Sequence, residues 1–427
     1  MRISILGAGY VGIVQAVGMA SHRHDVVLVE IDPRRMQLIK QGEAPMQEAG
    51  LEPLLKSVLG TKLQVTDKLS AKAADAEVII ICVQTNGRSE GTFELAHLEQ
   101  ATMDVAGILK GRNNYPVVVV KSTVIPGTTE NTVRAILEKH SGEKTGAGFG
   151  LAVNPEFLRE GKALEDWFHP DRIVIGEHDA ASGDKVVAIY KEFDIPVIRV
   201  DLKTAEMIKC VSNAFLATKI SYINEIGNIC KRMGIDIGEI ARGMSLDRRI
   251  SPHFLEAGIG FGGSCLPKDT RALVSLAQEL EYEPVLLESV LKLNEQQCLR
   301  LIHLAERKAG DLRNKIVAVL GLAFKKDTDD IRESPAIRVV MDLLERGASV
   351  SVYDPAAMDN ARSFFGERVE YAGSAREAVA SAEVVLVITD WDELNDPALF
   401  NGKIAIFGRN LDVIARLVNE NSEGICW

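Results

Sequence analysis

The chain has 427 residues, of which 46% are apolar and 26% are charged, a composition typical of a soluble globular protein with two or three domains. Its formal net charge of -11 argues against nucleic-acid binding, which requires a basic face, and no apolar run approaches the length of a membrane span. The six cysteines form no CxxC pair or metal-type cluster. We therefore expect free thiols, no metal site and a cytoplasmic protein.

The N-terminal segment predicts a dinucleotide site. An apolar run at 3–6 is followed by GAGYVG (7–12), a helix-like stretch, a second apolar run at 26–29 and then Glu30. In this pattern the three glycines permit a tight turn, the approach of a pyrophosphate and close helix packing. Glu30 would hold the ribose hydroxyls and favour NAD over NADP, although the nearby Arg34 and Arg35 keep a 2′-phosphate open.

Further short apolar strands are expected at 78–83 and 117–120, each flanked by helix-like stretches, which indicates a doubly wound parallel sheet. Ligands of such sheets bind beyond the carboxyl ends of the strands. The segments 84–86, with Gln84, Thr85 and Asn86, and 122–127, beginning with Ser122 and Thr123, fall there. The hydroxyls could contact the cofactor or could simply cap turns.

The charged residues of two segments could be either functional or solvent-exposed. In NPEFLREG (154–161), the carboxylates beside Arg159 either steer protons or form a solvated helix start, and the residues alone favour the solvated start. From about 204 to 233 a proline-free helical pattern carries Glu206, Lys209 and Asn213 at helical spacing. We expect a long helix that forms a spine and a dimer surface. The alternative is a solvent face, which we expect for Lys219 and Lys231.

The segment GFGGSCLPKD (260–269) places Cys265 after two glycines and before Lys268 and Asp269. A lysine near a cysteine favours the thiolate, the form that attacks carbonyl carbon. If a helix begins here, Cys265, Lys268 and Asp269 share a face of its first turns. The alternative is a glycine turn before a capped helix, with an inert buried cysteine.

The second half predicts another α/β unit, with strands at 315–320, 350–353 and 384–388. Lys325, Lys326, Arg332 and Arg409 lie in or beside strand-end loops, where phosphate would bind. The expected fold is α/β, with two Rossmann-like doubly wound domains joined by a long central helix. We expect an NAD-binding domain at 1–200, a helical dimerisation region with the cysteine loop at 201–300, and a second Rossmann-like domain at 301–427 for a phosphorylated ligand.

Taken together, these motifs resemble one family. The segments GAGYVG (7–12), STVIPGTT (122–129), NPEFLREG (154–161), AEMIKCVSNAF (205–215), GFGGSCLPKD (260–269) and GLAFKKDTDDIRESP (321–335) resemble those of the UDP-glucose and GDP-mannose 6-dehydrogenases, in the same order. These enzymes use NAD to oxidise the C6 alcohol of a nucleotide sugar to a carboxylate. The resemblance covers the chain from Met1 to the C-terminal segment.

The resemblance implies a role for each catalytic candidate. Cys265 is the nucleophile, which adds to the aldehyde as a thiohemiacetal and becomes a thioester after the second oxidation. Asp269 and Lys209 handle the alcohol proton and the developing oxyanion, which Asn213 assists. Glu156, with Thr123, serves thioester hydrolysis.

The resemblance also implies the binding residues. The expected NAD contacts are Gly7, Gly9, Tyr10, Val11, Gly12, Glu30, Arg35, Thr85, Ser122, Thr123, Glu160, Lys268 and Arg332. The expected substrate contacts are Phe157, Leu158, Lys209, Asn213, Arg249, Phe254, Gly262, Phe324, Lys325 and Arg409. Arg249 is expected to reach the substrate across a dimer interface, so we expect a homodimer or higher homo-oligomer whose partner is a nucleotide sugar, with no nucleic acid and no membrane.

The motifs do not agree on the identity of the sugar. Segments 247–255, 261–263 and 408–410, with Arg249 and Arg409, resemble the UDP-glucose enzymes, whereas the tail 423–427 and Leu266 resemble the GDP-mannose enzymes. We weigh the pocket segments above the tail and favour UDP-glucose. Departures from the family pattern at Ala49, Gln84, Asn86, Ser251 and Phe407 leave a UDP-N-acetylhexosamine open, with Phe407 expected to affect the nucleotide pocket. A silent sensor of NAD and nucleotide sugar, or a two-electron enzyme that stops at the aldehyde, are the remaining alternatives.

Overall fold

The computed structural model describes residues 1–427 except 70, 89–90, 113 and 412–420. The chain divides into a first unit, Met1–Ser212, and a second unit, Asn213–Trp427. The two units are described separately below. The expected division into three domains stays a prediction.

The first unit is built on an eight-stranded sheet with the order β3-β2-β1-β4-β5-β6-β7-β8. Its strands are β1 (Arg2–Leu6), β2 (Asp25–Val29), β3 (Leu63–Thr66), β4 (Val78–Ile81), β5 (Val117–Val120), β6 (Gly150–Val153), β7 (Ile173–Glu177) and β8 (Val197–Val200). β6 pairs with β7 antiparallel, and the other neighbouring strands pair parallel. The strand order reverses at β1, with β2 on one side and β4 on the other, which is the point where ligands of such sheets bind.

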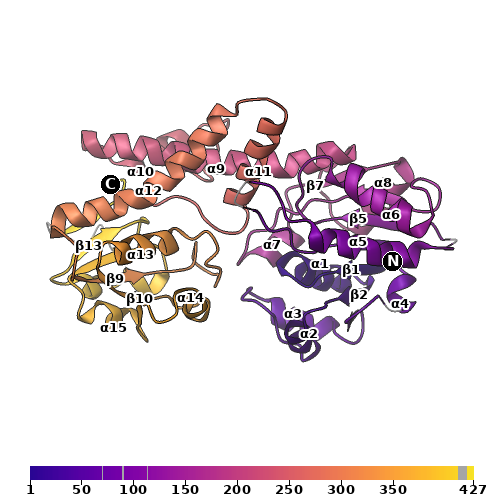
Figure 1. Ribbon diagram of the computed structural model, residues 1–427, viewed down its shortest axis with the longest axis horizontal. Helices are drawn as coiled ribbons and strands as arrows, with labels where there is room; N and C mark the ends of the chain where they lie inside the picture. Colours follow the sequence, from indigo (N-terminus) through magenta and orange to yellow (C-terminus); the bar gives the residue numbers. More distant parts are fainter. Residues whose placement is uncertain (70, 89–90, 113, 412–420) are drawn as a thin grey trace. The chain divides into compact units, whose positions relative to one another are not determined.

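Helices cover both faces of this sheet (Figure 1). They are α1 (Tyr10–Ser21), α2 (Pro33–Lys40), α3 (Leu51–Val58), α4 (Ala71–Ala74), α5 (Ala96–Leu109), α6 (Arg134–Ser141), α7 (Ala163–Phe168) and α8 (Ala180–Val187), with a π-helical turn at Thr129–Val133 and a 3-10 turn at Ala188–Tyr190. One core joins α1, α3 and α7 to alternate residues of the strands, such as Ile3 and Ile5. A second core, on the other face of the sheet, joins α5 and α6 to the remaining residues of the strands, such as Ile79 and Ile81. Because the central strands are buried on both faces, they are continuous apolar runs in the sequence.

The second unit has a six-stranded parallel sheet with the order β11-β10-β9-β12-β13-β14. Its elements are α10 (Ile237–Ser245), α11 (Leu266–Glu279), α12 (Val285–Ala309), β9 (Ile316–Leu320), α13 (Pro335–Glu345), β10 (Ser349–Tyr353), α14 (Met358–Phe365), β11 (Glu370–Tyr371), α15 (Ala375–Ala380), β12 (Val384–Val387), β13 (Ile404–Phe407) and β14 (Ser422–Gly424), with 3-10 turns at Asp392–Asn395 and Pro397–Phe400. The C-terminal segment thus supplies an edge strand of this sheet. A single core cluster contains most of the buried apolar side chains of this unit.

The two units share the 32-residue helix α9 (Leu202–Met233), because the boundary between Ser212 and Asn213 falls inside it (Figure 1). It begins two residues before the predicted start at Thr204 and ends at Met233 as predicted. The predicted fold class, two doubly wound α/β parts with a long helix between them in the chain, is confirmed. Within the described residues, no helix combines the length and apolar character that crossing a membrane requires.

Candidate active site

The three glycines of the loop after β1 are constrained in different ways. Gly7 has φ +94°, and a Cβ there would lie 2.8 Å from the carbonyl oxygen of Cys82. A Cβ on Gly12 would lie 1.8 Å from the carbonyl oxygen of Gly7, so this glycine permits the close packing of α1. A Cβ on Gly9 would meet no atom within 4 Å. The space over Gly9, at the N-terminus of α1, is therefore open to a ligand phosphate.

The Glu30 side chain, directly after β2, forms hydrogen bonds with this loop. Its Oε2 accepts hydrogen bonds from the Ala8 N–H at 2.8 Å and from Arg35 Nη1 at 3.2 Å, and its Oε1 accepts one from the Asp32 N–H at 2.8 Å. The buried carboxylate is thus fixed beside the glycine loop. An open glycine, a helix N-terminus and a fixed acid are the groups that a dinucleotide needs, so the residues fit NAD.

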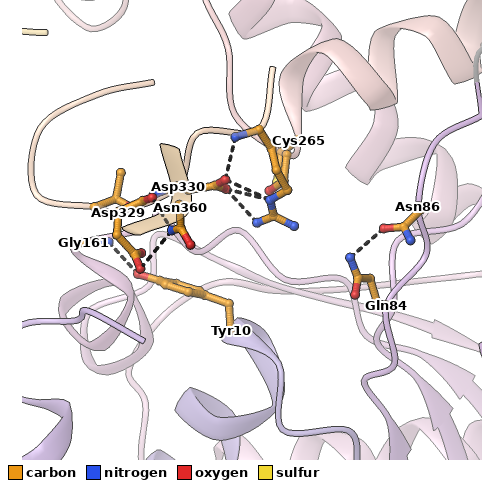
Figure 2. A network of polar contacts seen from close by, with 11 residues as sticks. Tyr10, Gln84, Asn86, Gly161, Cys265, Asp329, Asp330 and Asn360 are labelled. Carbon is orange, nitrogen blue, oxygen red and sulfur yellow. Dashed lines mark hydrogen bonds and ion pairs between the residues drawn. The ribbon is translucent and has the colours of Figure 1, made fainter. Parts of the chain in front are cut away.

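The predicted strand-end loops are tied to one another. The Thr85 hydroxyl donates to the Thr123 carbonyl at 2.7 Å, and the Ser122 hydroxyl donates to the Val83 carbonyl at 2.6 Å. Gln84 Nε2 donates to Asn86 Oδ1 at 2.6 Å (Figure 2). The loops after β4 and β5 therefore lie together, at the same carboxyl-terminal edge of the sheet as the glycine loop after β1. The sheet order requires this, because β1, β4 and β5 are neighbours.

Tyr10 links the glycine loop to the segment before α7 through an acid that the sequence analysis missed. The Tyr10 hydroxyl donates to Glu48 and accepts the Gly161 N–H at 2.5 Å (Figure 2). Glu48 also accepts the Gly161 and Leu164 N–H groups, at 2.9 and 3.3 Å. Burial and the Glu48 carboxylate raise the pKa of Tyr10 far above its ordinary value, so its hydroxyl keeps its proton. Glu160, predicted to bind NAD, directly precedes Gly161.

Glu156 is buried, and the expectation of a solvated carboxylate at this position is wrong. Its Oε1 lies 2.8 Å from Lys209 Nζ on α9, and its Oε2 accepts the Leu158 N–H at 2.7 Å. Burial raises the pKa of Glu156, but the charge and hydrogen bond of Lys209 outweigh burial and hold it below its ordinary value. The exposed charge of this segment is Arg159, whose guanidinium pairs with Asp166 of α7. Next to Glu156, the Phe157 ring lies under the Arg172 guanidinium, at 3.8 Å from its centroid.

Cys265 differs from the other cysteines of the chain. Cys82, Cys210, Cys230, Cys298 and Cys426 are buried, whereas Cys265 is only half-buried. It occupies the N-cap position of the 14-residue helix α11, where the helix dipole favours a thiolate. Burial raises the pKa of Cys82 to about 12 and that of Cys298 to about 11, so those thiols stay protonated at neutral pH. Cys265 is therefore not the buried cysteine that the alternative expected, and its role as a nucleophile stays a prediction.

Asp269 receives two polar partners one turn into α11. It is 1% exposed, and its Oδ1 lies 2.6 Å from Lys268 Nζ. Its Oδ2 accepts a hydrogen bond from Asn213 Nδ2 of α9 at 2.6 Å. The structure thus brings together three of the residues that the sequence predicted, Lys268 and Asp269 of α11 and Asn213 of α9.

The loop after β9 packs against the cysteine loop. A Cβ on Gly263, which has φ +83°, would lie 2.8 Å from the ring of Phe324, and one on Gly262 would lie 2.3 Å from the Glu333 carbonyl oxygen. The Gly263 N–H donates to the Arg332 carbonyl at 3.0 Å. The Arg332 guanidinium holds the Asp330 carboxylate, with an Nη2–Oδ2 distance of 2.7 Å (Figure 2). The two glycines are therefore needed for this close packing.

The remaining predicted substrate residues of the second unit differ in exposure. The Arg249 side chain is 88% exposed and is held by Asp247, at 2.6 Å. Phe254 has a left-handed φ of 63°. Arg409, which follows β13, donates to the Gly260 carbonyl at 3.0 Å, and the Lys325 ammonium lies 5.9 Å from the centre of the Phe324 ring.

Further expectations concern Phe407, Lys231 and Lys219. Phe407 is fully buried in the sheet core, with its ring 5.0 Å from that of Phe400, and its expected effect on the nucleotide pocket stays a prediction. Lys231 is not a solvent-face residue, because its ammonium binds Glu423 at 2.9 Å and the Trp427 carbonyl at 3.0 Å. Lys219 is also engaged, with the Ile250 carbonyl at 3.1 Å. The partners of the two lysines are far away in the sequence, which gives no signal of these pairings.

Asp354 is a second acid that the analysis missed, although its position after an apolar strand was visible. It follows β10 as Glu30 follows β2. It accepts hydrogen bonds from the N–H groups of Leu322, Ala323, Ala356 and Ala357 and from the Trp391 indole. Because these donors saturate the carboxylate, Asp354 braces the turn after β9 and is not available to a ribose.

The fold and the glycine-loop site define a dinucleotide-binding oxidoreductase with a second doubly wound unit. The chain belongs to the UDP-glucose/GDP-mannose dehydrogenase family: its NAD binding domain matches residues 1–194, its central domain 203–296 and its UDP binding domain 318–411. The protein is accordingly an NAD-dependent nucleotide-sugar dehydrogenase, as the sequence predicted.

Two curated relatives and one solved structure illustrate the similarity. The UDP-glucose 6-dehydrogenase YwqF of Bacillus subtilis is 40% identical over 416 residues, covering 94% of this chain and 93% of the relative. A GDP-mannose 6-dehydrogenase of Pseudomonas syringae pv. tomato is 39% identical over 428 residues, covering 99% of this chain and 94% of the relative. The structure of a UDP-glucose dehydrogenase from Pyrobaculum islandicum has a TM-score of 0.95 at 39% identity, covering 100% of this chain and 98% of that one.

Proposed function

We propose that this enzyme oxidises the C6 alcohol of UDP-glucose to the carboxylate of UDP-glucuronate in two successive two-electron steps, with Cys265 as the covalent nucleophile. The observation that carries the proposal is the position of Cys265. It is the one cysteine of the six that is not buried, and it caps α11 one turn before the buried Asp269. A simple alcohol dehydrogenase has no use for such a thiol.

The polar residues of the two units supply complementary chemistry. NAD, when bound, accepts the hydride of each oxidation. In the first oxidation the alcohol loses its proton to the Asp269 carboxylate, and the Lys209 ammonium and the Asn213 amide stabilise the negative charge that develops on the C6 oxygen.

The second oxidation proceeds through the protein. The Cys265 thiolate adds to the aldehyde carbon, and the resulting oxyanion takes up a proton to give the thiohemiacetal. Loss of this hydroxyl proton and of a hydride then leaves a thioester. Water attacks the thioester, Cys265 leaves as the thiolate, and the sugar carboxylate is released. Glu156 is held ionised by Lys209, so we assign it, with Thr123, to the activation of this water.

The choice of UDP-glucose rests on residues of the second unit. Arg409 follows β13 at a carboxyl strand end, where a nucleotide phosphate is bound in such sheets, and the matching domain model is the UDP binding domain. The tail that resembles the GDP-mannose enzymes forms β14 and is fastened to α9 through Lys231. Its contacts are structural, so we give it less weight for specificity.

We further propose that two chains associate through α9. Phe215, Tyr222 and Ile229 follow one another at seven-residue spacing on this helix and are 65%, 49% and 49% exposed. Residues at this spacing form one stripe along a helix, which a second copy would cover. Arg249, whose side chain points into solvent, then has a substrate to bind on the other chain.

The test compares initial rates of NADH formation with UDP-glucose and GDP-mannose at equal concentration. We expect a clear preference for UDP-glucose and two NADH per sugar. Faster turnover of GDP-mannose would show that the tail was the better guide, and one NADH per sugar would indicate an enzyme that stops at the aldehyde.

The matched variant is Cys265→Ala, with Cys298→Ala as a control that removes a buried thiol. Cys265→Ala should lose acid formation and keep NAD binding, while Cys298→Ala should keep both. If the parent protein binds NAD and nucleotide sugar but forms no NADH with any nucleotide hexose, a silent sensor replaces the enzyme.

A further inference from the structure

A buried lysine that the mechanism above does not use lies directly after β5. Lys121 is 3% exposed. Its ammonium donates hydrogen bonds to the Asn154 carbonyl at 3.1 Å, to Asn154 Oδ1 at 2.8 Å and to the Tyr190 hydroxyl at 3.4 Å. In the part of the chain that the structure describes, Lys121 forms no ion pair within 4 Å. A full positive charge is thus held by neutral groups alone.

These contacts fix Asn154 from every side. The Tyr190 hydroxyl donates to Asn154 Oδ1 at 2.6 Å, and Asn154 Nδ2 donates to the Val174 carbonyl at 2.8 Å. The Asn154 N–H donates to the Val120 carbonyl at 3.0 Å. Asn154 is the residue where β6 has ended and the segment that carries Glu156 begins, so Lys121 fixes the start of that segment.

Positively charged groups outnumber negatively charged groups in the surroundings of Lys121 and Glu156. The titratable groups that face it are Cys82 at the end of β4, Glu156 after β6, Tyr190 after α8 and Lys209 on α9. Burial lowers the pKa of Lys121 to about 8, although the Glu156 carboxylate acts to raise it. Burial also raises the pKa of Cys82 and of Tyr190, which keeps both groups neutral. Two ammonium groups therefore act on the single carboxylate of Glu156.

Such an arrangement is costly for folding. Removing a charge from water costs several kcal/mol even in a relaxed protein interior, roughly the size of a domain's whole stability. An apolar side chain of similar length would fill the same space without that cost. A role in the chemistry of Glu156 accounts for the charge.

We propose that Lys121 is a positioning residue for Glu156: it fixes the start of the Glu156 segment through Asn154 and, together with Lys209, keeps Glu156 as the carboxylate that activates water for thioester hydrolysis. This inference rests on the proposed function and assigns a further residue to its last step. Lys121 does not touch the substrate in this account. It acts through Asn154 by contact and on Glu156 by charge.

The experiment mixes enzyme with NAD and UDP-glucose, follows NADH in the first turnover and measures the mass of the intact protein after quenching. In Lys121→Met we expect two NADH per Cys265 at a rate close to the parent, followed by slow turnover and a covalent adduct on the protein. Hydrolysis should fall about tenfold or more, within the range of general-base effects, while the KM values change about threefold at most.

The pH profile separates the charge from the hydrogen bonds. Loss of one cation raises the pKa of Glu156, so the acid limb of the hydrolysis rate should move to higher pH in Lys121→Met. Tyr190→Phe removes a hydroxyl from the same ring of hydrogen bonds but keeps the charge, so its acid limb should match that of the parent. Lys121→Gln keeps a donor for Asn154 without the charge, and should reproduce the shift if the Met variant does not fold.

Three results would overturn the inference. An unshifted acid limb in both Lys121 variants would remove the charge effect. An equal fall of the first NADH step and of hydrolysis, with a lower melting temperature, would show a merely structural lysine. Glu156→Gln serves as reference: an adduct in this variant but not in Lys121→Met refutes the role of Lys121, whereas no adduct in either refutes the thioester mechanism and this inference with it.

Discussion

Gly9 and Gly12 are glycines of one motif that the structure assigns to different tasks. Gly12 makes room for the Gly7 carbonyl, whereas a side chain on Gly9 would contact nothing in the protein. The requirement at Gly9 therefore comes from the ligand. The motif predicts these two tasks from the order of its glycines, and the space around Gly9 and Gly12 agrees with that order.

The corresponding prediction uses two alanine variants. Gly9→Ala should leave the free energy of unfolding almost unchanged and weaken NAD binding about tenfold or more, because its methyl group occupies the space of the pyrophosphate. Gly12→Ala should lower the free energy of unfolding by about 1–3 kcal/mol, the usual cost of overpacking. Calorimetric titration with NAD and denaturant unfolding measure the two effects. Equal stability losses in the two variants would contradict the assignment.

Lys121 yields a prediction about stability that does not depend on activity. Its pKa is about 8 in the folded chain against an ordinary 10.5, so the unfolded chain binds this proton more tightly. Between about pH 8 and 10.5 the folded protein has lost the proton while the unfolded chain retains it, and the free energy of unfolding rises with pH. This contribution is complete above pH 10.5 and is lost as the pH falls through 8.

The measurement is urea unfolding of the parent and of Lys121→Met from pH 7 to 10, which covers most of this window. The parent should gain stability relative to the variant above about pH 8, since all other titrating groups are shared. Lys68→Met, at an exposed position, provides the control and should run parallel to the parent. Parallel curves for the parent and Lys121→Met would contradict the lowered pKa.

At the scale of the elements, the buried strands were predictable because they are short apolar runs bounded by turns, as β4 and β5 show. The helix α9 was predictable from its length without proline. The C-terminal edge strand β14 was not predicted, because its three-residue segment is polar and acquires its partner only in the sheet. Nothing local in the sequence indicates that β7 pairs antiparallel with β6.

The candidate site was predictable where its residues are close in the sequence. Cys265, Lys268 and Asp269 share one helix start, and Gly7 to Glu30 form one strand–helix–strand unit. The Glu156–Lys209 pair joins residues 53 positions apart, and Glu48 meets Gly161 from 113 positions away. Nothing local in the sequence signals such pairs. That is why Glu156 was read as solvated and Glu48 was missed.

The exposed stripe of α9 predicts self-association through that helix. Tyr222→Asp places a charge in the middle of the stripe and should weaken the dimer about 30-fold or more, the equivalent of about 2 kcal/mol for a central aromatic contact. Sedimentation over a range of protein concentrations measures the effect. Tyr282→Asp is the matched control, because Tyr282 is 69% exposed outside α9. An unchanged dimer in Tyr222→Asp would place the interface elsewhere.

At the scale of the whole molecule, the residues of the proposed chemistry are divided between the two units. The first unit contains the glycine loop, Glu30 and the Glu156–Lys209 pair, and the second contains Cys265, Asp269 and Arg409, for which we propose a contact with the nucleotide phosphates. Both units are doubly wound, but Asp354 saturates the acid position of the second unit with protein donors. The duplication of the fold therefore does not imply a second NAD site.

A complementation experiment tests whether the working molecule is a dimer that shares residues. Arg249 is exposed and Cys265 is half-buried, so Arg249→Ala and Cys265→Ala can each be made without disturbing the core. If Arg249 serves the site of the other chain, a mixed dimer contains one site with both residues intact and one with neither. Random reassortment of the two inactive variants should then recover about a quarter of the parent activity, since half of the dimers are mixed and half of their sites are complete. Arg249 acting within its own chain leaves every site of the mixed dimer defective, so no recovery after subunit exchange would contradict the shared site. The double variant, mixed with the parent protein, controls for exchange itself and should halve the parent's own share, since both sites of each mixed dimer then lack one residue.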